Sequence, residues 1–208
     1  EVNVVGTQRV LDWSRMHSIK RFVYSGTSSL YGHQNQIPFK PNMPADCLNP
    51  YSMSKWMGEQ VCRLYSQLYH MECTVLRYFN VYGPREPTKG LYSPVVGLFK
   101  RQIRQGRPIT IVGDGSQRRD FTYVSDVVLA NIAAMKEPFN DKLFEIYNVG
   151  TGKNYSINEI ANLLNAKNIV YINDRPAEVK ETLADIAKTI NNLKWKPKYT
   201  LEQKIMSY

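Results

Sequence analysis

The sequence lacks the features that mark several broad classes of protein. It has only three cysteines in 208 residues, none in a Cys-x-x-Cys arrangement, so neither a disulfide framework nor a zinc site is expected. The cysteines are expected to be reduced thiols, two of them buried, as in a cytoplasmic protein. No run of apolar residues approaches the length needed to cross a bilayer. A membrane protein is therefore not expected.

Acidic residues are also scarce, and the formal net charge is +9. A basic chain can bind nucleic acid, but here lysine and arginine are dispersed rather than gathered on one periodic face. No helix-turn-helix, zinc-finger or RNP pattern occurs, so a nucleic-acid partner is not expected. At 43% hydrophobic residues, the chain can bury a core and suits one domain or two small lobes.

Helical and strand patterns alternate along the chain, which predicts an α/β protein. Proline at position 50 favours a helix start there, and Ser156 with Glu159 forms a predicted capping box. An apolar stripe at helical spacing (Met57, Val61, Leu64 and Leu68) indicates packing or a dimer contact. The segment 33–48, with three prolines, is predicted to be a surface loop. Helices are predicted at 4–16, from 50, at 95–105, at 125–136, from 156 and at 185–193, and strands at 21–25, 73–79, 108–112, 144–149 and 169–173.

Tyr51 and Lys55 are the most informative pair of residues. Positions four apart share one face of a helix, so the phenol and the ammonium can address one point. A nearby positive charge favours the phenolate, and such a tyrosine can take a proton from a sugar hydroxyl while hydride leaves the same carbon. The hydroxyl of Thr27, at a strand end, would complete the set. The spacing alone is weak evidence, because it also describes an ordinary surface helix.

A series of motifs in fixed order strengthens that interpretation. With them, the chain resembles the extended short-chain dehydrogenase/reductase superfamily, in its branch of nucleotide-sugar epimerases and dehydratases. The resemblance covers nearly the whole length. The matching segments are Asn3-Val4-Val5-Gly6-Thr7, residues 25–32, Pro50-Tyr51-Ser52-Met53-Ser54-Lys55, residues 77–85, residues 113–121, residues 123–127, residues 148–152 and Arg175-Pro176-Ala177-Glu178.

The resemblance implies the C-terminal part of a Rossmann-type doubly wound parallel sheet together with a small α+β substrate lobe. The family's glycine-rich turn, which lets the backbone approach a pyrophosphate, does not occur in these residues. We therefore expect the N-terminal half that carries it to be missing. Residues 1–82 are expected to form the remaining Rossmann part. Residues 83–208 are expected to form mainly the nucleotide-sugar lobe, with Rossmann segments interleaved at about 120–150.

The resemblance also implies roles for individual residues. Thr27 would touch the reacting sugar oxygen, Tyr51 would act as general base, and Lys55 would bind the nicotinamide ribose and tune the tyrosine. Purely structural roles stay open as alternatives, such as a surface ion pair for Arg119 and a turn role for Asn80. The further implied contacts are Phe79 and Asn3 with the cofactor, Asn80, Arg119 and Arg175 with the diphosphate, Val95 and Ile111 with the nucleobase, Glu178 with the ribose, and Thr182 with the sugar at C2.

The two residues after Thr27 indicate the reaction. Dehydratases of the family carry an acid–base pair where this chain has Ser28 and Ser29, and serines cannot supply that proton transfer. The resemblance therefore implies an NAD-dependent 4-epimerase, an enzyme working through a 4-keto intermediate. Its substrate would be a UDP-hexose or, because Thr182 is small, a UDP-N-acetylhexosamine, and it would be a homodimer. Two alternatives remain open: another nucleotide-sugar reductase or epimerase, and a non-catalytic nucleotide-sugar-binding module.

Overall fold

A three-stranded parallel sheet forms the centre of the computed structural model, which describes residues 1–88, 94–139, 142–174 and 178–208. Its strands are β1 (Arg21–Thr27), β2 (Glu72–Tyr78) and β7 (Phe144–Val149), in the order β1-β2-β7. In the register of the sheet, the last residue of β1 lies beside the last residues of β2 and β7. The three carboxyl ends therefore meet at one edge, where ligands of open α/β sheets bind.

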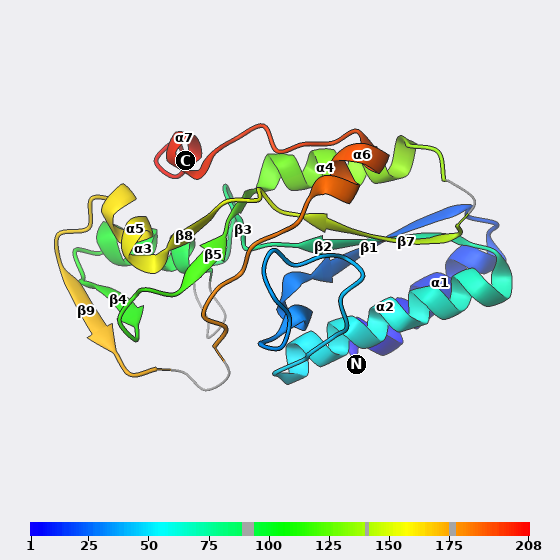
Figure 1. Cartoon of the computed structure of the whole chain (residues 1–208), viewed down its shortest axis with the longest axis horizontal. Coiled ribbons are helices and arrows are strands. Elements are labelled where there is room, and N and C mark those ends of the chain that lie inside the picture. The colour runs from blue at the N-terminus through cyan, green and yellow to red at the C-terminus, as the bar shows by residue number, and fades with distance from the viewer. Residues whose placement is uncertain (89–93, 140–141, 175–177) are drawn as a thin grey trace.

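Helices cover both faces of this sheet (Figure 1). On one face lie the short π-helical segment η1 (Val2–Gly6), α1 (Thr7–Met16) and α2 (Pro50–Tyr69). On the other lie α4 (Val124–Lys136) and α6 (Ala187–Leu193). Side chains alternate along a strand, so Cys73 and Val75 of β2 join the core under α1 and α2, while Leu76 joins the core under α4.

Smaller elements pack beyond the carboxyl ends of the sheet. They surround a core of their own, which includes Phe99, Ile111, Tyr155 and Ile160. The helices there are α3 (Val95–Arg104), α5 (Ile157–Leu163) and α7 (Leu201–Lys204). The short 3-10 helix η2 (Ser28–Tyr31), which directly follows β1, packs in a separate cluster with Phe39 and Phe79. The strands form a parallel pair β3 (Val81–Tyr82) with β6 (Thr122–Tyr123), a parallel pair β4 (Ile109–Val112) with β9 (Ile169–Ile172), and an antiparallel pair β5 (Arg118–Asp120) with β8 (Asn154–Ser156).

Most predicted elements are present, with ends shifted by one to three residues. The capping box of Ser156 and Glu159 is confirmed at the start of α5. Cys62 and Cys73 are buried free thiols, as expected. The first helix differs from its prediction because its first turn, Val2–Gly6, is π-helical. Among the described residues, no helix is both long and apolar enough to cross a membrane.

The segment 33–48 is irregular, as predicted, and its residues are exposed or partly exposed with the exception of Phe39. Phe39 is buried against Tyr31 and Phe79, and its backbone N–H donates to the carbonyl of Leu183 at 2.7 Å. The prediction did not foresee this anchor, in which one aromatic side chain supplies apolar area to bury. The segment therefore forms a wall that packs between η2 and residues 183–185.

Candidate functional site

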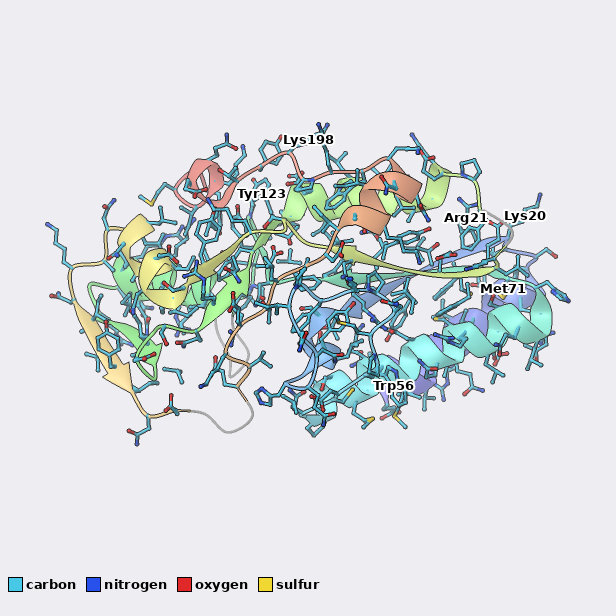
Figure 2. All side chains as sticks on the ribbon, in the orientation of Figure 1. Lys20, Arg21, Trp56, Met71, Tyr123 and Lys198 are labelled. Carbon is cyan, nitrogen blue, oxygen red and sulfur yellow. The ribbon has the colours of Figure 1, made fainter. Side chains whose placement is uncertain are left out.

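Thr27 stands at the carboxyl end of β1, where the strand turns into η2. Its hydroxyl caps η2 by accepting a hydrogen bond from the Ser29 N–H at 3.2 Å, and it donates to Ser29 Oγ at 3.1 Å. The residue is largely buried. The strand begins near one end of the molecule, where Lys20 and Arg21 lie (Figure 2). A hydroxyl held in this way points from a rigid strand end toward the edge where ligands bind.

Tyr51 lies in the first turn of α2, and the start of that helix is well defined. Asn49 is the N-cap, and its side chain accepts from the Ser52 N–H at 2.9 Å, while the Ser52 hydroxyl bonds back to Asn49. Pro50 occupies the first helical position, where its missing N–H costs nothing. The Tyr51 side chain is 52% exposed. The cap therefore fixes the backbone under Tyr51 while its phenol stays accessible.

Lys55 follows one helical turn later and is half-buried. Its Nζ lies 4.5 Å from the centre of the Tyr24 ring. Burial lowers the pKa of Lys55, and the nearby Glu59 carboxylate acts in the opposite direction. Asn3, in η1, donates to Ser54 Oγ at 3.0 Å, so it ties the preceding segment to the helix that carries Tyr51 and Lys55.

A cleft of about 490 Å³ lies at the carboxyl edge of the sheet. It brings together six of the predicted site residues from five separate parts of the chain. Those six are Thr27, Tyr51, Asn80, Arg119, Glu178 and Thr182. Ser28 and Ser29, which decided between the predicted reactions, also line it. Side chains that are far apart in the sequence thus face one volume, large enough for a small polar ligand.

Arg119 lies in β5 and reaches the cleft with most of its side chain shielded. Its Nη2 pairs with a Glu178 carboxylate oxygen at 3.1 Å, and its Nη1 donates to the Arg118 carbonyl at 2.8 Å. Burial lowers the pKa of Arg119, and the Glu178 carboxylate acts in the opposite direction. The neighbouring Arg118 instead pairs with Glu159 at 3.0 Å, so of the two arginines only Arg119 lines the cleft.

Asp120, the residue after Arg119, is fully buried and organises this side of the cleft. Its carboxylate accepts from the backbone N–H groups of Thr151, Gly152 and Ala184 at 2.8 to 3.2 Å. Its own N–H donates to Thr182 Oγ1 at 3.3 Å. Burial raises the pKa of Asp120. One carboxylate therefore fixes the backbone on which both Arg119 and Thr182 stand.

Five of the predicted contacts, Lys55 among them, lie outside the cleft's lining, and one lies outside the described residues. Phe79 and Ile111 have fully buried side chains in two different cores, and Val95 packs against the second of them. The side chains of Phe79 and Ile111 are thus committed to packing, which leaves their backbone as the part that can contact a ligand. Asn3 contacts α2 as described above. Arg175 belongs to the residues that the structure does not describe.

Sequence reasoning missed a buried polar network behind the cleft. Arg77 donates to Glu59 at 2.8 to 3.3 Å and to the Tyr31 hydroxyl at 3.0 Å. The Tyr31 hydroxyl in turn donates to Asn148 at 2.6 Å. All four side chains are essentially inaccessible to water. The signal was Glu59 four residues after Lys55, together with a charged residue inside the otherwise apolar strand pattern of β2.

Comparisons with known proteins agree with this geometry. The model of the NAD dependent epimerase/dehydratase family matches residues 1–150. A putative UDP-glucose 4-epimerase of Methanocaldococcus jannaschii is 37% identical over 99% of this chain and 67% of its own length. The structure of a Thermotoga maritima UDP-glucose 4-epimerase with UDP-glucose is 32% identical, with a TM-score of 0.90 over 98% of this chain and 66% of that one.

A third relative was solved with a cofactor. It is the UDP-glucuronic acid 4-epimerase of Bacillus cereus, in complex with UDP-glucuronic acid and NAD, at 29% identity and a TM-score of 0.88. This chain is covered over 98% of its length and that chain over 64%. The chain thus spans about two thirds of the length of the relatives it matches. It belongs to the NAD dependent epimerase/dehydratase family.

Proposed function

We propose that the complete protein containing this chain is an NAD-dependent UDP-sugar 4-epimerase. The observation that carries the proposal is the cleft in which Thr27 and Tyr51 face Arg119, Glu178 and Thr182. It offers a hydroxyl and a phenol at one side and a guanidinium at the other. That is the chemistry required to hold a diphosphate sugar while a proton moves at its ring.

The residues present fit the nicotinamide end of NAD. The half-buried Lys55 ammonium, one turn from the accessible Tyr51 phenol, can donate to ribose hydroxyls, and the backbone of Phe79 directly follows the end of β2 at the carboxyl edge of the sheet. Asn3 supports this helix through Ser54. When bound, NAD would supply reversible acceptance of a hydride from the sugar carbon.

Tyr51 would be the group that moves the proton. As the base it takes the proton of the sugar's C4 hydroxyl, and it returns a proton when the 4-keto sugar is reduced on its other face. Thr27, fixed by its bond to Ser29, would hold the same oxygen by a hydrogen bond. The Lys55 ammonium, one helical turn away, would bring a positive charge to this side of the site.

The other side of the cleft would recognise the nucleotide and the sugar. The planar guanidinium of Arg119 suits a diphosphate, as does Arg175 by its place in the sequence, while Asn80 offers an amide. Glu178 would accept from ribose hydroxyls. Val95 and Ile111 would meet the nucleobase, Ile111 through its backbone. Thr182 would line the pocket for the C2 substituent, where its small side chain admits an N-acetyl group.

The two alternatives predict different behaviour. A reductase would consume NADH or NADPH stoichiometrically, whereas an epimerase regenerates its cofactor at every turnover. Ser28 and Ser29 favour the epimerase over a dehydratase, since neither can act as an acid or base near neutral pH. A binding module would take up UDP-sugar without converting it. Absorbance at the nicotinamide band during turnover, with analysis of the sugar product, separates all three.

The division into a Rossmann part and a substrate lobe, and a homodimer, remain part of the proposal. Supporting the dimer, Met57, Leu64 and Leu68 are exposed along one face of α2. An apolar stripe of this kind is typical of protein contacts. Light scattering on the purified protein measures the assembly directly, and a monomer at micromolar concentration would contradict it.

Tyr51→Phe tests the proposed reaction. The ring stays and the proton acceptor is lost, so turnover of UDP-glucose or UDP-N-acetylglucosamine should fall by about two to four orders of magnitude. Binding of UDP should barely change. The matched control is Tyr78→Phe, which removes the hydroxyl of another tyrosine in the cleft lining, one that bonds to Asn131 of α4. Turnover retained in Tyr51→Phe would overturn the proposal.

A further inference from the structure

Tyr24 touches Lys55 in two places. The Lys55 Nζ lies 4.5 Å from the centre of the Tyr24 ring, and the Tyr24 hydroxyl donates to the Lys55 carbonyl oxygen at 3.2 Å. Tyr24 is buried in β1, three residues before Thr27. A single side chain from the strand therefore contacts both the main chain and the ammonium of the helical residue.

Close packing of α2 on β1 makes this contact possible. Gly58, one turn after Lys55, lies directly over the tyrosine. A Cβ at that position would be only 2.2 Å from the Tyr24 hydroxyl oxygen and 2.7 Å from the Asn3 carbonyl oxygen. Any larger residue would push the helix away from the strand. The Lys55 side chain therefore extends from α2 across the ring of Tyr24.

Few other groups compete for the Lys55 ammonium within the described residues. The titratable groups that act on it are Glu59 and Cys62, both from α2 itself. The Glu59 carboxylate already accepts three hydrogen bonds from Arg77. Burial raises the pKa of Tyr24, so its ring stays a neutral phenol. The partner that touches the ammonium is then the face of an aromatic ring.

We propose that Tyr24 is a positioning residue, whose ring face holds the Lys55 ammonium in place beside Tyr51. An aromatic face carries partial negative charge and attracts a cation, most strongly where water is excluded. A lysine side chain has four flexible bonds. A fixed contact for its ammonium excludes conformations in which the charge points away from the phenol of Tyr51. The inference rests on the proposed function, in which Lys55 assists Tyr51.

The experiment, in the complete protein, first changes the charge of the ring face with little change of shape and then removes the ring. Three variants at position 24 form the series: Tyr24→Phe, a substitution by 3,4,5-trifluorophenylalanine introduced by nonsense suppression, and Tyr24→Leu. Phe22→Leu is the matched control, because Phe22 lies two residues earlier on the same strand and packs against the same core. The pH profile of kcat/KM is measured for each, with circular dichroism and UDP binding as checks of folding.

Tyr24→Phe should keep the profile of the natural protein, because the ring is retained. The trifluorinated ring and Tyr24→Leu should move the acidic limb to higher pH, by about half a unit or more, and lower kcat roughly 3- to 30-fold at neutral pH. Phe22→Leu should leave the limb in place. An acidic limb unmoved by the fluorinated ring, in protein that is folded and active, would overturn the proposal even if Tyr24→Leu fails to fold.

A second readout does not depend on activity. In protein labelled with 13C at the lysine Cε, the Lys55 resonance is assigned by its loss in Lys55→Met, and its titration gives the Lys55 pKa. That pKa should be lower with the fluorinated ring than in Tyr24→Phe, because the ring no longer stabilises the ammonium. Equal Lys55 pKa values in the two variants would contradict the proposed contact between the ammonium and the Tyr24 ring. Absence of epimerase activity in the natural protein would instead contradict the proposed function.

Discussion

The two sides of the cleft are held in place by different kinds of interaction. On the side of Thr27 and Tyr51, the proposed catalytic groups stand on the end of a strand and the start of a capped helix. Behind them is a network of side chains, with the Glu59–Arg77 pair at its centre. On the side of Arg119 and Thr182, the residues stand on short segments tied together by backbone hydrogen bonds to Asp120.

This difference suggests a division of labour. Proton transfer depends on reacting atoms held within a fraction of an ångström, which suits elements locked by buried packing. Recognition of a ligand tolerates more adjustment, which suits segments held by main-chain bonds at their ends. We therefore expect substitutions behind the first side to affect folding and those on the second side to affect binding. The following predictions test that separation.

The largest expected effect is on stability. In Glu59→Gln the Arg77 guanidinium stays buried without its counter-charge, so the free energy of unfolding should fall by about 3–5 kcal/mol. Urea denaturation measures it. The matched control is Glu72→Gln, which breaks the more accessible pair with Arg21 and should cost about 1 kcal/mol or less. Similar losses in both variants would show that burial of the first pair does not matter.

Removing the guanidinium on the second side should affect binding. Arg119→Ala should weaken the affinity for UDP by about 1.5–3 kcal/mol, the usual value for hydrogen bonds to a charged group. Calorimetry with UDP measures it. Arg119→Lys should recover only part of the loss, because a point charge lacks the planar geometry. Arg118→Ala, whose side chain pairs with Glu159, should bind UDP normally, and Arg175→Ala should behave like Arg119→Ala. Unchanged UDP affinity in both Arg119→Ala and Arg175→Ala would contradict the proposed contact of these arginines with the diphosphate.

Filling the pocket at Thr182 should change selectivity more than overall affinity. Thr182 is buried at the wall of the cleft, and Thr182→Tyr adds a ring there. Overfilling a packed site costs about 1–3 kcal/mol. The activation free energy derived from kcat/KM should therefore rise by about 1–3 kcal/mol more for UDP-N-acetylglucosamine than for UDP-glucose. Competition assays with both sugars measure the ratio. Parallel losses on the two substrates would mean that Thr182 does not border the C2 substituent.

The smallest expected effect lies away from the cleft. Ser156→Ala removes the side chain that caps α5, which should cost about 1 kcal/mol of stability. UDP affinity should stay the same, because α5 does not line the cleft. Thermal unfolding and calorimetry on the same preparation measure both quantities. A change in UDP affinity would show that the second side is coupled to its supporting helices.

Much of the fold could be predicted from local sequence signals. Pro50 predicted the start of α2, and Ser156 with Glu159 predicted the start of α5. The placement of Thr27, Asn80 and Thr182 at one cleft followed from the order of the family's motifs together with the rule that parallel strands end at one edge. The two helix starts depend on residues that are close in sequence, and the shared cleft depends on where the strands end.

Other features depend on contacts between distant segments, and the sequence could not reveal them. Nothing local distinguishes Phe39, buried by residues 183–185, from an exposed loop aromatic. In the sequence, Asp120 is an ordinary acidic residue after an arginine. Its structural role depends on the backbone N–H groups of Thr151 and Ala184, which bond to its carboxylate only in the folded chain. Likewise Glu59 and Arg77 become a pair only once α2 packs on β2. Buried polar networks of this kind are properties of the assembled core.

Asp120 also has a geometric consequence for substrate choice. Its main chain continues from Arg119, and its carboxylate accepts from the backbone N–H of Ala184. The backbone N–H of Thr182 donates to the Arg118 carbonyl oxygen at 3.0 Å, a bond that does not depend on the side chain at position 182. The proposed diphosphate contact and the proposed sugar contact are thereby kept at a constant separation. A change of residue at position 182 would alter which sugar fits without moving the proposed diphosphate contact at Arg119. Sugar preference in this scaffold can therefore diverge while nucleotide recognition stays the same.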